Sequence, residues 1–319
     1  MSAARPSILL TGRIPSSVVA TLEGIGELDQ FRRDGVDVMP HGELVARVAG
    51  KQALVSMITD AVSRDVIEAG GDLKVIANAA VGYNNIDVAA ARERGIVVTN
   101  TPGVLTDATA DLTWALILGI TRRMGEGERL VRRGAWKGWT FDFMLGAELR
   151  GKQLGIVGYG GIGRAVAARG RAFGMRIAYT NRTPKNDPGA EAMPLDRLLA
   201  TSDIVSLHCP LTPETRHVID QPALARMKRS AYLINTSRGP VVDEKALAWA
   251  LRTHLIAGAG LDVFEEEPKV EPELLTLENV MLVPHLGSGT VETRTAMADL
   301  AARNVAAVLS GQAPLTPVS

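Results

Sequence analysis

The sequence predicts an α/β protein built from two doubly wound parallel-sheet domains. Two observations lead to this fold class. Short apolar runs of strand length alternate with longer segments of helical period along the chain, as in repeated β-α-β units. The chain is also 319 residues long. At roughly 150 residues per domain, this length favours two domains, each large enough to bury its own core.

The first series of elements occupies the N-terminal third of the chain. Its expected strands are the apolar runs 7–11, 53–57, 74–77 and 96–99. Helical segments are expected at 64–69 and 88–94, and the second ends at Gly95, a residue type typical of the position after a helix. This alternation predicts parallel pairing through crossover helices.

A long helical pattern at 108–123 connects this series to a second one. The segment 134–151 that follows is polar, carries two tryptophans and is expected to be a loop. Strands of the second series are expected at 154–157, 175–179, 204–207, 231–235, 257–261 and 280–283. A helix is expected after the first of these strands, at 164–173, and an alanine-rich helix at 291–309. The chain therefore contains two α/β units.

Charge and composition exclude several classes of protein. The chain has 35 Lys and Arg residues against 35 Asp and Glu residues, so it offers no net field for binding nucleic acid or an anionic membrane. No apolar run approaches the ~18 residues of a membrane span, and the N-terminus lacks a signal-peptide pattern. Cys209 is the single cysteine, so neither a disulfide nor a thiolate metal cluster is expected. We expect a cytoplasmic protein without a metal.

A glycine-rich turn lies between the expected strand 154–157 and the expected helix 164–173. It reads Gly158-Tyr159-Gly160-Gly161-Ile162-Gly163 and matches the dinucleotide-binding pattern G-x-G-x-x-G in the right context. The first glycine permits a tight turn, the second lets a pyrophosphate approach the backbone, and the third allows close packing of helix on strand. The helix N-terminus offers N–H groups to the phosphates. The turn therefore predicts a dinucleotide site.

The residues after the next strand concern the choice between NAD and NADP. An NAD site usually has Asp or Glu here, which accepts from the ribose 2′-hydroxyl and repels a 2′-phosphate. This chain has Asn181-Arg182-Thr183 instead, which supplies an uncharged amide, a guanidinium and a hydroxyl. Because a guanidinium suits phosphate, we expect NADP(H) to be preferred, with NAD(H) as the alternative.

Polar side chains follow three later strands, at the ends where open α/β sheets bind ligands. Arg238 follows the expected strand 231–235, the acidic run 265–267 follows 257–261, and His285 follows 280–283. These residue types suit the reduction of a 2-oxo acid. An Arg would bind the carboxylate and polarise the carbonyl, a His would donate a proton, and a Glu would stabilise the imidazolium. The alternative interpretation is a set of surface ion pairs and a structural histidine.

The chain resembles the D-isomer-specific 2-hydroxyacid dehydrogenase family, most closely its glyoxylate/hydroxypyruvate reductase branch, over nearly its whole length. The resemblance is carried by 80–87 (AVGYNNID), 98–103 (VTNTPG), the glycine turn, 208–212 (HCPLT) and the Arg, Glu and His segments. It implies a Rossmann-type cofactor domain, residues 101–286, inserted in a flavodoxin-like substrate-binding domain made of residues 1–100 and 287–319. The active site would lie in a cleft between the two domains.

The resemblance also implies roles for individual residues. Arg238 would bind substrate, His285 would be the acid/base, and Glu267, rather than Glu265 or Glu266, would partner His285. The implied substrate-binding residues are Val81, Gly82, Arg238, His285 and Trp139. Trp139 would reach the partner subunit's active site, or would anchor a dimer loop together with Trp136. Including the stretches described above, the expected cofactor-binding residues are Thr109, Gly158, Gly160, Gly161, Ile162, Gly163, Asn181, Arg182, Thr183, Cys209, Pro210, Thr215, Thr236, Ser237, Arg238, Asp262, His285 and Gly287.

The activity implied by the resemblance is reduction of glyoxylate or hydroxypyruvate to the D-2-hydroxy acid by a homodimeric, NADPH-preferring oxidoreductase. Within the same family, 2-ketogluconate reductase or another D-2-hydroxyacid dehydrogenase is the alternative. A nucleotide-sensing corepressor is an alternative from a different class, because such proteins keep this fold and these residues. Turnover of a 2-oxo acid separates the two classes.

Overall fold

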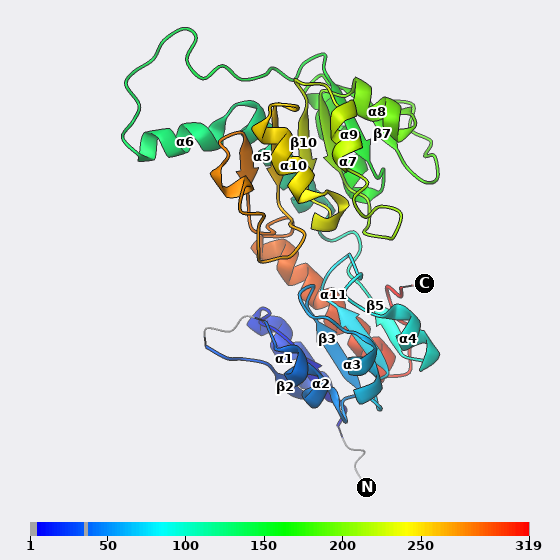
Figure 1. Cartoon of the computed structure of the whole chain (residues 1–319). Helices are drawn as coiled ribbons and strands as arrows, with labels where there is room; N and C mark the ends of the chain where they lie inside the picture. The colour runs from blue at the N-terminus through cyan, green and yellow to red at the C-terminus, as the bar shows by residue number, and fades with distance from the viewer. Residues whose placement is uncertain (1–4, 35–37, 319) are drawn as a thin grey trace. The chain divides into compact units, whose positions relative to one another are not determined.

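The protein is described by a computed structural model that covers residues 5–34 and 38–318 and divides into two compact units (Figure 1). The first unit comprises Met1–Leu105 and Thr290–Ser319, and the second comprises Thr106–Gly289. The chain therefore leaves the first unit, forms the second and returns. The expected division, 1–100 with 287–319 against 101–286, lies a few residues from the observed one at each boundary.

The first unit contains a five-stranded parallel sheet with the strand order β2-β1-β3-β4-β5. Its strands are β1 (Ser7–Leu10), β2 (Glu27–Gln30), β3 (Ala53–Ser56), β4 (Val75–Asn78) and β5 (Val97–Thr99). Its helices are α1 (Ser16–Ile25), α2 (His41–Val48), α3 (Arg64–Ala69), α4 (Val88–Glu93) and α11 (Val291–Leu309). This strand order is the flavodoxin-like one.

Helices cover both faces of this sheet. On one face, small side chains of α11 such as Ala298, Ala301 and Ala302 pack with Ile8 and Leu10 of β1, and they let the helix approach the strands closely. The other face packs against apolar side chains of α2, α3 and α4. Because both faces are covered, β3 and β4 are buried along their whole length, which explains their continuous apolar character.

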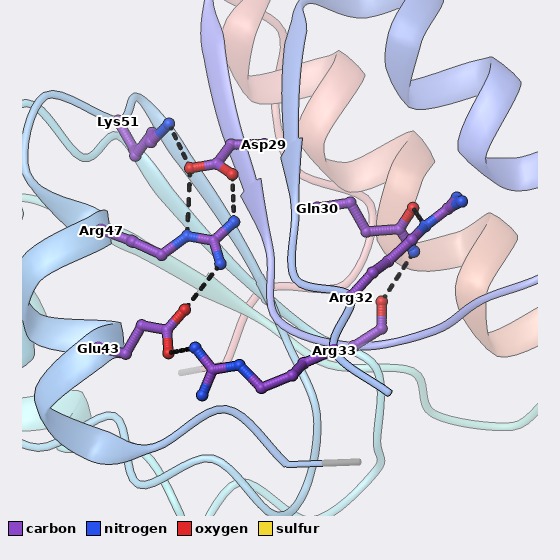
Figure 2. A network of polar contacts seen from close by, with 8 residues as sticks. Asp29, Gln30, Arg32, Arg33, Glu43, Arg47 and Lys51 are labelled. Carbon is purple, nitrogen blue, oxygen red and sulfur yellow. Dashed lines mark hydrogen bonds and ion pairs between the residues drawn. The ribbon is translucent and has the colours of Figure 1, made fainter. Parts of the chain in front are cut away.

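A network of ion pairs fastens α2 to the edge strand β2 (Figure 2). The guanidinium of Arg47 contacts both Asp29 on β2 and Glu43 on α2, while Lys51 Nζ lies 2.8 Å from Asp29 Oδ2. Arg33 extends the network, with Nη2 2.8 Å from Glu43 Oε2. Burial works against the charge of Asp29, but the hydrogen bonds from Arg47 and Lys51 outweigh it and lower the pKa of Asp29. Polar contacts thus hold a strand that has little apolar surface.

The second unit contains a seven-stranded parallel sheet with the order β12-β11-β10-β9-β6-β7-β8. Its strands are β6 (Gln153–Val157), β7 (Arg176–Thr180), β8 (Glu191–Ala192), β9 (Ile204–Leu207), β10 (Tyr232–Asn235), β11 (Gly258–Leu261) and β12 (Val280–Leu282). Its helices are α5 (Thr106–Thr121), α6 (Met124–Arg132), α7 (Gly161–Ala172), α8 (Leu195–Thr201), α9 (Gln221–Arg226) and α10 (Glu244–Arg252), with 3-10 turns at Gly239–Val241 and Leu274–Thr276.

The strand order of the second unit reverses at β6, which has β7 on one side and β9 on the other. Open α/β sheets bind ligands at such a switch point, outside the carboxyl ends of the strands. Every candidate catalytic residue follows a strand of this sheet. The two parallel sheets confirm the predicted fold class.

The segment after α6 runs as a long open loop (Figure 1). Trp139 is 76% exposed and Phe141 is 87% exposed, and Trp136 and Phe143 are exposed as well.

Within the described ranges, no helix is long and apolar enough to cross a membrane. The same residues contain no group of three or more His, Cys, Asp or Glu side chains that could hold a metal ion.

Candidate active site

The glycine turn connects β6 to the N-terminus of α7. Gly158 has a φ of +93°, and a Cβ atom there would lie 2.5 Å from the backbone nitrogen of Cys209. A Cβ atom at Gly163 would lie 2.3 Å from the carbonyl oxygen of Gly158. In contrast, a Cβ atom at Gly160 would meet nothing within 4 Å. The first and third glycines therefore allow backbone contacts, while the second borders open space that a pyrophosphate could enter.

Asn181, directly after β7, organises the loop that follows this strand. Its Oδ1 accepts a hydrogen bond from the N–H of Tyr159 at 3.0 Å, and its Nδ2 donates to the carbonyl of Thr183 at 2.7 Å. Arg182 and Thr183 are exposed. The pKa of Glu214 is lowered, mainly by a hydrogen bond from Thr212 and in smaller part by the charge of Arg182. The guanidinium therefore stands at the end of β7, where a ribose 2′-substituent is expected.

Two stacked tyrosines hydrogen-bond to the loop after β7. The rings of Tyr159 and Tyr179 lie 4.2 Å apart between centroids. Tyr179 donates to the carbonyl of Lys185 at 2.6 Å, and Tyr159 donates to Asp187 Oδ2 at 2.6 Å. Burial and the bond to Asp187 raise the pKa of Tyr159 to about 12, so its hydroxyl stays protonated. The loop after β7 is thus tied to the glycine turn.

The turn after β9 faces the glycine turn and contains His208, Cys209 and Pro210. Burial lowers the pKa of His208 to about 3, so the imidazole is neutral, and its Nε2 lies 2.8 Å from Ser206 Oγ. Burial also raises the pKa of the Cys209 thiol to about 11, which makes it a poor nucleophile. The hydroxyl of Thr215 donates to the carbonyl of Pro210 at 2.6 Å. These polar side-chain groups are engaged within the turn. We therefore expect any cofactor contact there to come from backbone atoms and apolar side-chain atoms.

Arg238 follows β10 in a turn that Asn235 orders. Asn235 Oδ1 accepts from the hydroxyl of Ser237 at 2.8 Å, and Asn235 Nδ2 donates to the carbonyl of Arg238 at 2.9 Å. Thr236 directs its hydroxyl to Thr113, 2.9 Å away. Burial lowers the pKa of the Arg238 guanidinium, and the charge of Glu267 acts in the opposite direction. The turn therefore holds a half-buried cation close to Glu267.

Glu267 and His285 form a hydrogen-bonded pair, with Glu267 Oε2 2.8 Å from His285 Nδ1. Glu267 Oε1 accepts from the N–H of Phe264 at 3.1 Å, which fixes the orientation of the carboxylate. Burial works against its charge, but the bond to His285 and the charges of His285 and Arg238 outweigh it and lower the pKa of Glu267. The carboxylate is therefore ionised, and it bonds the Nδ1 atom of His285 rather than Nε2.

Asp262 builds the turn that carries His285. Its side chain is 1% exposed, and its carboxylate accepts from the N–H groups of Leu286 and Gly287, the latter at 2.8 Å. The hydroxyl of Thr109 donates to the carbonyl of Gly287 at 3.2 Å. His285 itself has a φ of +52°. Asp262 and Thr109 thus hold the turn in the shape that points His285 toward Glu267.

Val81 and Gly82 lie in the loop after β4 in the first unit. Their carbonyl oxygens accept hydrogen bonds from Asn100 Nδ2 and Asn78 Nδ2, both at 2.8 Å. Within residues 5–34 and 38–318, no hydrogen-bond partner is found for the N–H groups of Val81 and Gly82. A loop with fixed carbonyls and unpaired N–H groups is suited to bind an anion such as a carboxylate.

Comparison with known proteins places the chain in a family. A model described as "D-isomer specific 2-hydroxyacid dehydrogenase, NAD binding domain" matches residues 114–287, more than half of the chain. The chain belongs to this family. It is also 48% identical to a glyoxylate reductase of Thermococcus litoralis over 97% of this chain and 96% of that protein. The predicted family membership is therefore confirmed.

Solved structures of similar proteins share the fold of this chain. A protein of Thermus thermophilus is 46% identical and superposes with a TM-score of 0.92, over 98% of this chain and 100% of that one. An NADPH-dependent glyoxylate/hydroxypyruvate reductase from Sinorhizobium meliloti, in complex with NADP and malonate, is 37% identical with a TM-score of 0.90. That match covers 99% of this chain and 97% of the other.

Several residues that shape the candidate dehydrogenase site were not expected from the sequence. Asn78 and Asn100 fix the carbonyls of the Val81–Gly82 loop, and Asn235 orders the turn before Arg238. The available signal was an asparagine at or just after the end of a strand, a position where a side-chain amide often bonds the backbone. Trp139 lies in the exposed loop after α6 of the same unit as His285.

Proposed function

We propose that this dehydrogenase reduces a small 2-oxo acid, glyoxylate or hydroxypyruvate, to the D-2-hydroxy acid, with NADPH as the preferred reductant. The observation that carries the proposal is the Glu267–His285 pair, bonded at 2.8 Å, with Arg238 close enough for its charge to lower the pKa of Glu267. The names of the glyoxylate reductases that the chain is similar to support the substrate class.

In this proposal His285 is the general acid. A protonated imidazole held by Glu267 through Nδ1 presents Nε2–H, which donates its proton to the carbonyl oxygen as that oxygen becomes an alkoxide. Glu267 keeps the ring oriented and stabilises its positive charge. In the reverse direction, neutral His285 accepts the proton of the hydroxy acid.

Arg238 would bind the substrate carboxylate and polarise the carbonyl. A guanidinium is suited to this task because it presents several N–H donors in a fixed plane. In the first unit, the N–H groups of Val81 and Gly82 are candidate donors to a carboxylate, since their carbonyls are already bonded to Asn100 and Asn78. These groups would select a 2-oxo acid over an uncharged ketone.

The residues of the second unit fit a nicotinamide dinucleotide. The open space beside Gly160 and the N-terminus of α7 would hold the pyrophosphate, and the loop 181–183 would hold the adenosine ribose. When bound, the reduced nicotinamide supplies the hydride for the carbonyl carbon. Thr109 and Asp262 bond the backbone of Gly287 and so hold the turn that carries His285.

The preference for NADPH rests on the end of β7. An exposed guanidinium at Arg182 would pair with a 2′-phosphate, and no acid follows the strand directly to repel it. The family member from Sinorhizobium meliloti is described as NADPH-dependent, which supports the same choice.

We also propose that two copies associate through the loop after α6. Its exposed tryptophans and phenylalanines form an apolar surface of the kind that marks an interface. Trp139 would then contribute to the partner's substrate site. Light scattering on the purified chain should give twice the monomer mass.

We also propose a cytoplasmic location. The single cysteine of the chain, Cys209, is free, as expected in a reducing compartment.

Replacing the acid tests the proposed function. His285→Asn should lower kcat by about 10²-fold or more, because asparagine cannot donate the proton, while cofactor binding measured by fluorescence stays unchanged. His254→Asn is the matched control, since His254 and His285 have φ values of +51° and +52° and asparagine tolerates this conformation. A near-normal kcat in His285→Asn would remove His285 from the proposed role.

A further inference from the structure

A buried carboxylate outside the candidate site holds the segment that carries Glu267. Glu244 is the first residue of α10 and is only 6% exposed. Its Oε1 accepts from the N–H of Glu265, and its Oε2 accepts from the N–H of Glu271 at 3.2 Å. In return, the N–H of Glu244 donates to Glu265 Oε2 at 3.2 Å. One side chain thus grips the 265–271 segment on both sides of Glu267.

Burial and two neighbouring carboxylates oppose the charge of Glu244, and its two backbone bonds offset this only in part. Burial raises the pKa of Glu244, the carboxylates of Glu265 and Glu271 act in the same direction, and the two N–H bonds act against them. Its neighbour Glu265 is bonded in turn to His217, with Oε1 2.5 Å from Nε2. A buried carboxylate beside other carboxylates is not expected to stabilise the folded state. We therefore looked for a role of Glu244 in the position of the segment that it bonds.

The segment held by Glu244 also packs against the turn that carries Arg238. A Cβ atom at Gly239 would lie 1.8 Å from the carbonyl of Phe264, so the two backbones are in direct contact. The N–H of His217 donates to the carbonyl of Pro240 at 2.8 Å, which links the segment that carries His217 to the same turn. Movement of the 264–271 segment would therefore move Glu267 away from both Arg238 and His285.

We propose that Glu244 is a positioning residue for the reaction: it clamps the 265–271 segment so that Glu267 stays bonded to His285. The inference rests on the proposed function, because it acts only through Glu267. It assigns no contact between Glu244 and substrate or cofactor. Its expected signature is a loss in kcat without a loss in cofactor binding.

The test is a double-mutant cycle on the full chain, with Glu244→Ala, Glu267→Gln and the combination, each assayed for glyoxylate reduction. Glu244→Ala should lower kcat roughly ten- to a hundred-fold, as a small misplacement of a catalytic group does. Glu244→Gln keeps one acceptor oxygen and should recover most of this loss. Glu273→Ala, which removes the half-buried partner of Arg252 on the same helix, is the control and should leave kcat unchanged.

The combination decides the matter. If Glu244 acts through Glu267, then Glu244→Ala should have less than about a two-fold effect once Glu267 is glutamine, because coupled residues are not additive. Losses that multiply in the double variant would overturn the inference and leave the proposed function intact. A wild-type kcat for Glu267→Gln alone would overturn the inference, because Glu267 would then have no role in turnover for Glu244 to support. The absence of glyoxylate reduction by the wild-type chain would overturn the proposed function itself. If Glu244→Ala does not fold, the same cycle is run with Glu244→Met, which removes both acceptor oxygens and keeps most of the side-chain volume.

Discussion

Asn181 and Arg182 contribute in different ways to the choice of cofactor. The side chain of Asn181 is engaged at both ends, with the N–H of Tyr159 and the carbonyl of Thr183. Arg182 is exposed at the same loop and supplies charge. An aspartate at position 181 could still accept from Tyr159, but it would add a negative charge that repels a 2′-phosphate and accepts from a ribose hydroxyl.

We therefore expect Asn181→Asp combined with Arg182→Ala to change the ratio of kcat/KM for NADPH over NADH by about 10²-fold in favour of NADH. Charge-assisted bonds are worth about 1.5–3 kcal/mol, which corresponds to this range. Steady-state kinetics with both cofactors measures the ratio. Arg176→Ala, at the opposite end of β7, is the control and should leave it unchanged. A wild-type protein that already prefers NADH would contradict the role of Arg182.

At the scale of elements, the glycines of the glycine turn have different tasks: one allows close packing and another leaves room for a ligand. Gly163 must lack a side chain because α7 crosses the carbonyl of Gly158 at close range, whereas Gly160 borders open space. An added methyl group therefore has different consequences at the two positions. At one it collides with backbone, and at the other it only occupies the space that we assign to pyrophosphate.

Gly163→Ala should destabilise the free protein by about 1–3 kcal/mol, because the helix must shift away from β6. Gly160→Ala should leave the unfolding midpoint of the free protein close to wild type but should weaken cofactor binding by about ten-fold or more. Thermal unfolding without cofactor and a fluorescence titration with NADPH make the two measurements. Wild-type cofactor affinity in Gly160→Ala would show that the pyrophosphate does not lie there.

Elements with clear apolar patterns were predictable from the sequence, and edge strands were not. The helices at 64–69 and 291–309 and the strand at 204–207 have the expected bounds. Strand β2 reads ELDQ and β8 is two exposed residues, so neither has the apolar run on which the prediction depends. Both lie at sheet edges, where pairing and ion pairs such as Arg47 with Asp29 replace burial.

Site residues that belong to a sequence motif were predictable from the sequence. The partner that each side chain contacts was not, when that partner lies far away in the chain. Three acids are consecutive in the sequence, yet the structure directs Glu265 to His217, Glu266 to Lys269 and Glu267 to His285. Periodicity alone cannot assign these directions, because they depend on how the turn packs against residues far away in the chain. The clamp formed by Glu244 is invisible to pattern analysis for the same reason.

At the scale of the whole molecule, a chain of zero net charge places basic side chains after several strands of one sheet. The 35 basic and 35 acidic residues cancel overall, and many of them are paired on the surface of the described units. Arg182, Arg238 and His285 all belong to the second unit and follow β7, β10 and β12 of one sheet. Local charge of this kind suits one nucleotide and one small acid rather than a polymer.

The central claim is that this chain transfers a hydride from NADPH to a small 2-oxo acid. The most direct measurement is the initial rate of NADPH oxidation, followed by absorbance, with glyoxylate, hydroxypyruvate and 2-ketogluconate in turn and with NADH in parallel. We predict a kcat on the order of 1–10³ s⁻¹ with glyoxylate or hydroxypyruvate, and its loss in His285→Asn. If neither cofactor is oxidised with any of these acids, the chain is not this reductase, and a nucleotide-sensing protein is favoured instead.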